Sequence, residues 1–120
     1  MANINIQIYA LKKNFDVQKA ERFFKERRIP FQTVDLKKHM PGQREIDLFC
    51  RAAGSAYNLV DRKSVTVMSH PVAHTSDEGV IREYFAEHPE FMRLPIIRNG
   101  NKVTIGTDEA EWKKWVESAG

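Results

Sequence analysis

The N-terminal part of the chain alternates between strand and helix patterns, and this order most constrains the fold. From Ile4 to Tyr9, apolar and polar residues alternate, which indicates a strand. The next apolar residues share one face of a helix, namely Val17, Ala20, Phe23 and Phe24. After Pro30, Phe31–Leu36 indicates a second strand. Because one helix joins them, the two strands are expected to be parallel, with a right-handed crossover.

The middle of the chain is expected to be mostly helical. Apolar residues with one-face helical spacing predict a helix that stops at Gly54, and they are Ile46, Phe49, Cys50 and Ala53. The stretch 57–73 is weakly patterned and predicts only short helical turns. Thr75 and Glu78 have the spacing of a capping box, so a further helix is expected from there to about Glu87, before His88-Pro89.

The C-terminal part predicts a hairpin followed by a helix. Leu94–Arg98 indicates a strand, Asn99-Gly100 a tight turn and Lys102–Ile105 the returning strand. Asp108 and Glu111 form a second expected capping box. The last helix has a single apolar stripe, made of Trp112, Trp115, Val116 and Ala119. The helical spacing predicts that both tryptophans are core residues and not a stacking platform for a ligand.

These elements fit one α/β domain over residues 1–120. The order strand, helix, strand, several helices, hairpin and helix predicts a mixed four-stranded sheet with helices on both faces. Hydrophobic residues make up 42% of the chain and charged residues 29%, as in a globular protein with one core. The first residues lack the charged and apolar regions of a signal peptide, and no apolar run suits a membrane helix. We therefore expect a cytoplasmic protein without membrane contact.

The chain is mildly basic, with a net charge of +3. Much of the excess lies early, in Lys12, Lys13, Lys19, Arg22, Lys25, Arg27 and Arg28. Such a surface suits an acidic protein partner or a small anion, although a solvated helix face has the same composition. Direct nucleic-acid binding is not expected, because acidic residues are interspersed and no recognised nucleic-acid motif accompanies the basic ones.

Three segments resemble the arsenate reductase (ArsC) and Spx-like family of the thioredoxin/glutaredoxin fold. They are Ile6–Tyr9 with Asp16–Phe24, then Ile29–Leu36, then Glu87–Ile97 with Gly106 after the hairpin. The third segment, a helix ending in His-Pro before a Pro-Ile-Ile strand, is the most specific. The resemblance implies a thioredoxin-like fold over essentially the whole chain and a cis peptide bond between Leu94 and Pro95.

The same resemblance places the catalytic cysteine of the family in the loop after the first strand, and here that position is Asn14. Val17 stands where some members have a second cysteine. Among the arginines that hold the oxyanion in arsenate reductases, Arg62 matches one. Another is replaced by Leu94, with Arg93 one residue earlier. Because redox chemistry of this type needs a thiolate, we do not expect arsenate reduction.

The remaining candidate site is a small basic pocket. Lys12, Lys13 and Asn14 precede a helix N-terminus, and with Arg62 and Arg93 they are expected to bind a ligand beside Pro95. The alternative is a relic loop, with two solvated lysines and Asn14, or else Asp16, as the helix cap.

Two other candidates have simpler explanations. Cys50, the only cysteine, lies on an apolar helical stripe and is expected to be a core residue. His70 and His74 are four residues apart, but Pro71 lies between them and no further ligand has suitable spacing, so no metal site is expected.

Two functions follow from the sequence. The first is a non-redox relative of arsenate reductases that binds a protein partner or a small anion. The alternative is a glutathione-linked reductase or transferase that uses the cleft beside the cis proline without its own thiol. No cofactor is expected, except that glutathione is a candidate ligand.

Overall fold

In the computed structural model, which describes residues 4–119, four strands form one mixed sheet in the order β2-β1-β3-β4. They are β1 (Ile6–Ala10), β2 (Phe31–Asp35), β3 (Ile96–Asn99) and β4 (Lys102–Ile105). β1 pairs parallel with β2 and antiparallel with β3, and β3 pairs antiparallel with β4. The predicted parallel pair, hairpin and mixed sheet are confirmed.

Helices connect and cover the strands. They are α1 (Phe15–Glu26), α2 (Gln43–Ala53), α3 (Ala56–Leu59), α4 (Val65–Met68), α5 (Glu78–Glu87) and α6 (Glu109–Ala119), with short 3-10 turns at Pro71–His74 and Pro89–Phe91. Between residues 4 and 119, no helix combines the length and apolarity needed to cross a membrane.

Different helices pack on the two faces of the sheet. On one face, Ile8 and Ile97 pack with α1 and with the buried Trp112 and Trp115 of α6, as the helical stripe predicted. The side chain of Ala119, which completes the predicted stripe, lies outside the described part. On the other face, a second core cluster joins the sheet to α2 through α5.

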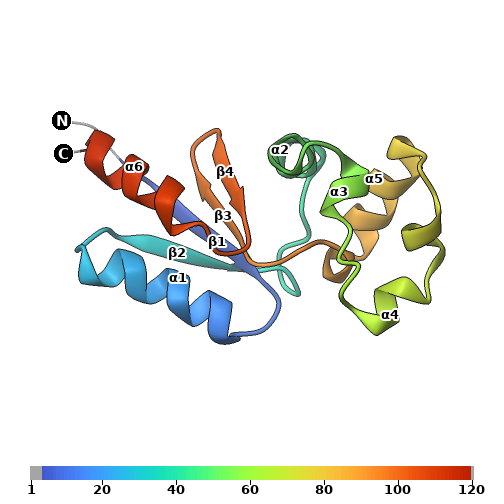
Figure 1. The fold of residues 1–120 in the computed structure, drawn as a ribbon, viewed down its shortest axis with the longest axis horizontal. Coiled ribbons are helices and arrows are strands. Elements are labelled where there is room, and N and C mark those ends of the chain that lie inside the picture. Colours follow the sequence, from blue (N-terminus) through green and yellow to red (C-terminus); the bar gives the residue numbers. More distant parts are fainter. Residues whose placement is uncertain (1–3, 120) are drawn as a thin grey trace.

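The molecule is elongated, with extents of 44 × 25 × 24 Å. Figure 1 shows the sheet with α1 and α6 toward one end, while α3, α4 and α5 form a helical part at the other. A binding site with residues from both parts can therefore form where the connecting segments of the chain pass between them.

One predicted capping box is wrong and the other is half formed. α5 begins after Asp77, whose side chain accepts the amides of the first turn, and the Glu78 carboxylate does not turn back to Thr75. It instead accepts N–H groups of Ala56 and Tyr57 at 2.7 and 3.0 Å, which ties α5 to α3. This long-range contact outcompetes the local one.

At α6, Asp108 accepts the Glu111 N–H at 3.2 Å as predicted. The carboxylate of Glu111, however, accepts the indole N–H of Trp115 at 3.0 Å, so the reciprocal half of the box is replaced.

The third strand begins later than predicted, at Ile96, because Pro95 has no N–H for the ladder. The Leu94–Pro95 peptide bond is cis, which confirms the expectation from the resemblance. The carbonyl of Pro95 accepts the N–H of Gly106 at 2.8 Å, so the segment before β3 is joined to the turn after β4.

Candidate functional site

A cleft of about 800 Å³ lies where the two parts of the molecule meet. Its wall combines the first turn of α1, the loop after α3, the residues before Pro95 and the turn after β4. The side chains that matter most for its chemistry are Asp16, Asp61, Arg62, Lys63, Arg93 and Thr107. The cleft therefore lies next to the cis peptide bond and beside the start of α1.

Arg62 is the most constrained charged side chain of the cleft. Its guanidinium lies over the ring of Tyr57, 3.9 Å from the ring centre, and its Nη1 donates to the carbonyl of Tyr57. Its Nη2 is buried and has no hydrogen-bond partner within residues 4–119. Burial of an unpaired donor is costly, and the cost is greater for a charged group. Arg62, a residue of the cleft wall, thus has a fixed guanidinium with one donor that is unpaired among the described residues.

Two further cations lie in the wall. The Arg93 backbone N–H donates to the Leu59 carbonyl at 2.8 Å, and its Nη1 donates to the Asn58 carbonyl at 3.3 Å. The backbone N–H of Lys63 donates to Asp61 at 3.2 Å, while its side chain is exposed. Both cations are anchored through the backbone and keep their charged ends near solvent.

Two carboxylates moderate this positive charge. Asp61 is bound to the backbone of Lys63, as described above, and Asp16 has an oxygen 3.5 Å from the Thr107 hydroxyl. With three cations and two carboxylates, the cleft wall has a modest positive excess.

Asn14 caps α1, as one of the two sequence alternatives proposed. Its side-chain oxygen accepts the N–H of Val17 at 2.9 Å, and Val17 is buried. Neither Asn14 nor Lys12 is among the described residues of the cleft wall. The position that the resemblance assigns to a reactive thiol therefore holds an amide whose oxygen stabilises the helix start.

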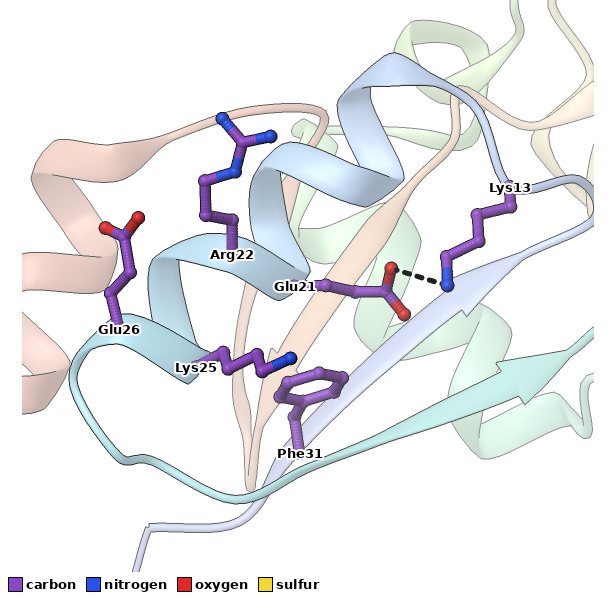
Figure 2. Close-up of a pocket in the computed structure, with 6 residues that line it drawn as sticks. All are labelled: Lys13, Glu21, Arg22, Lys25, Glu26 and Phe31. Atoms are coloured by element: carbon purple, nitrogen blue, oxygen red, sulfur yellow. Dashed lines mark ion pairs between the residues drawn. The ribbon is translucent and has the colours of Figure 1, made fainter.

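Lys13 lies in a different pocket. Its Nζ is 3.2 Å from Glu21 Oε1, and Figure 2 shows it reaching along α1 toward that carboxylate. This second pocket, of about 490 Å³, lies between α1 and β2, with Lys25 and Phe31 in its wall. The predicted basic group is thus divided. Arg62 and Arg93 meet next to Leu94 and the buried Pro95, whereas Lys13 forms an ion pair elsewhere.

Cys50 is a core residue, as predicted. It lies on α2 with 1% of its surface exposed, and burial raises the pKa of its thiol to about 11. No cysteine lines the cleft within the described residues. At neutral pH Cys50 is protonated and shielded, so it is not available as a nucleophile.

The histidine pair has local structural roles. His70 accepts the N–H of Val72 at 3.0 Å, and a ring nitrogen of His74 lies 2.7 Å from the carbonyl oxygen of Met68. Within residues 4–119, no group of three or more His, Cys, Asp or Glu side chains is arranged to hold a metal ion.

The sequence did not indicate several residues in the cleft wall or next to it. Tyr57, the shelf under Arg62, lies in the weakly patterned stretch and gave no signal. Lys63 follows Arg62 directly in the chain, so its place near the cleft could have been predicted from that of Arg62. Asp16 and Thr107 come together only through the fold, so their spacing in the sequence carried no information.

Comparison with solved structures shows which folds are similar. An arsenate reductase (ArsC) related protein from Brucella melitensis aligns with a TM-score of 0.69 and 20% identity, over 96% of this chain and 97% of that protein. An arsenate reductase from Vibrio cholerae aligns with a TM-score of 0.71 and 15% identity, over 98% of each chain. A protein named YFFB aligns with a TM-score of 0.77 and 17% identity, over 91% of this chain and 96% of that one.

No protein-family model matches the sequence, and no curated protein matches it either. The similarity is therefore one of fold, at identities too low to transfer an activity. On this evidence the chain has a thioredoxin-like α/β fold, arranged as in arsenate reductase-related proteins.

Proposed function

We propose that the cleft beside Pro95 binds an anionic group, of a small molecule or of a protein partner, and that it does so without a thiol of its own. The observation that carries the proposal is the buried Nη2 of Arg62, a cationic donor without a partner among the described residues. A carboxylate or oxyanion that accepts from Nη2 would remove the cost of burying it unpaired.

The surroundings of Arg62 support this function. Stacking on Tyr57 and donation to its carbonyl hold the guanidinium in place, so little side-chain entropy is lost on binding. Arg93 and Lys63 add positive charge on the same wall. Asp16 and Asp61 repel extended polyanions, so a single carboxylate or oxyanion suits the cleft better.

A redox role for the protein's own thiol is not part of the proposal. Asn14 stands at the position of the nucleophile in the resembling family, and Cys50 is buried with a raised pKa. Glutathione remains a candidate ligand, because it presents carboxylates and would supply its own thiol. A glutathione-linked enzyme is therefore the alternative function of the same cleft.

Thermal unfolding tests the proposal with three probes, phosphate, arsenate and reduced glutathione, each titrated against the purified protein. A ligand at about one hundred times its dissociation constant stabilises the folded state by about 2.7 kcal/mol. We expect at least one probe to raise the melting temperature in a saturable way.

The variant Arg62→Met keeps an unbranched side chain over Tyr57 but removes the charge, so it should abolish the shift. Arg51→Met removes an exposed arginine of α2 outside the cleft and is the matched control, with the shift retained. No stabilisation by any probe, or stabilisation that persists in Arg62→Met, would refute the proposal.

A further inference from the structure

Large apolar side chains are exposed around the cleft. Six such residues are exposed in the described part, namely Phe15, Met40, Tyr57, Val65, Met68 and Val80. Four of them lie in segments that build or adjoin the cleft, and these are Phe15, Tyr57, Val65 and Met68. Single exposed apolar residues are ordinary, but a concentration around one polar cleft is typical of an interaction surface.

Phe15 and Val65 are the most exposed of these side chains, at 76% and 83%. Phe15 is the first residue of α1 and directly precedes Asp16 of the cleft wall. Val65 is the first residue of α4, two residues after Lys63 of the same wall. In Figure 1 the start of α1 and α4 both lie along the lower edge of the molecule. Phe15 and Val65 therefore each neighbour in the chain a residue of the cleft wall, Asp16 and Lys63 respectively.

Tyr57 and Met68 extend this apolar surface. Tyr57 is exposed although Arg62 lies against its ring, and Met68 ends α4. Tyrosine, methionine and arginine are enriched in protein–protein interfaces.

The charge beside this surface is complementary to an acidic partner. Residues 12–28, which include α1, contain seven basic and three acidic side chains. Arg62, Lys63 and Arg93 supply the cations of the cleft itself. An acidic segment would thus meet positive charge in the cleft, and oppositely charged surfaces favour both encounter and correct orientation.

We propose that the physiological ligand of the cleft is an acidic segment of another protein. A carboxylate of that segment pairs with Arg62, and its apolar side chains pack on the rim formed by Phe15, Tyr57, Val65 and Met68. This proposal rests on the proposed function, because it uses the same anion site and adds the class of partner.

A phage-displayed library of random linear peptides, selected on the immobilised protein, tests the partner class. Selected peptides should be rich in Asp and Glu and contain Phe, Leu or similar apolar residues.

A synthetic, fluorescently labelled peptide of the selected sequence is then titrated against four proteins: the unaltered chain, Phe15→Ser, Val65→Ser and Val80→Ser. The first two substitutions should each weaken binding about tenfold, the effect of a loss of about 1.4 kcal/mol. Val80→Ser, an exposed site on α5, should not weaken it.

The outcomes separate this inference from the anion site. Phe15→Ser and Val65→Ser should retain any thermal stabilisation by phosphate or glutathione, because neither side chain contributes to the charged wall. If a small anion stabilises the protein but selection yields no acidic peptides, or the rim substitutions leave peptide affinity unchanged, the inference fails and the proposed function stands. Stronger binding of a single-stranded oligonucleotide than of the selected peptide would also overturn it.

Discussion

Asn14 supplies the start of α1 with a hydrogen-bond acceptor but carries no thiol. The start of α1 needs an acceptor for its free N–H groups, and the amide oxygen of Asn14 provides one for Val17. An amide has no nucleophilic sulfur, however, and cannot enter a disulfide cycle. The helix start is therefore maintained by a residue that is inert in redox reactions.

The burial of Cys50 leads to a prediction about the reactivity of its thiol. With a pKa of about 11, roughly one thiol in a thousand is ionised at pH 8, and the side chain is also buried. We expect the native protein to react with the thiol reagent DTNB orders of magnitude more slowly than the protein unfolded in guanidinium. The rate should rise with pH up to the raised pKa, provided that the fold persists.

The unfolded protein is the internal control, since it contains the same thiol without its surroundings. Rapid, stoichiometric labelling of native Cys50 at pH 8 would contradict the structural role and reopen the question of a protein-borne nucleophile.

Residue roles that depend on local periodicity were predictable. The helical stripe predicted burial of Cys50, and Asn14 was one of two residues, with Asp16, that the sequence offered as the cap of α1. The orientation of Lys13 was not predictable, because it follows from the placement of Glu21 one and a half turns into α1, close enough for an ion pair. The contact of Tyr57 with Arg62 was not predicted, because only the short turn of α3 brings the ring under the guanidinium.

Between elements, the most consequential contact is that of Glu78 with the start of α3. Its two carboxylate oxygens accept the N–H groups of Ala56 and Tyr57, and Tyr57 in turn carries Arg62. Glu78 of α5 thus helps to position Arg62, although Glu78 itself is not in the cleft wall.

Replacing Glu78 tests this connection. Glu78→Gln removes the charge and one of the two acceptors, so we expect a loss of about 1–2 kcal/mol in the free energy of unfolding, measured by urea denaturation. Glu83→Gln, at an exposed site of the same helix, should change stability by less than about 0.5 kcal/mol. Equal effects of the two substitutions would show that Glu78 is not a structural link.

Elements with a clear local pattern were predicted with their positions, whereas the weakly patterned stretch 57–73 predicted short helical turns without positions. The returning strand Lys102–Ile105 and the stop of α2 at Gly54, where φ is +99°, agree with the sequence. α3 and α4 are single turns, capped by the side chains of Ser55 and Ser64, and are too short for an apolar period to show. The error at Thr75 arose because a capping pattern is local, whereas Glu78 bonds to a distant helix.

For the whole molecule, the strand order determines where the site forms. Because β1 and β3 are central, the start of α1 and the segment before β3 meet at one end of the sheet, and the turn after β4 joins them. The helical part then closes the cleft with Arg62 and Lys63. The sequence was sufficient for the sheet and for the arginine pair beside Pro95, but not for the separation of Lys13 from that pair.

The proposed function requires that Arg62 and Arg93 bind an anion in the cleft beside Pro95. The most direct measurement is a titration of the ¹⁵N-labelled protein with phosphate, followed by NMR of arginine Nε–Hε groups and backbone amides. We predict saturable shifts at the side chains of Arg62 and Arg93 and at the amides of Gly106 and Thr107. Shifts confined to the pocket of Lys13 and Lys25, or no saturable shift at Arg62, would contradict anion binding in the cleft.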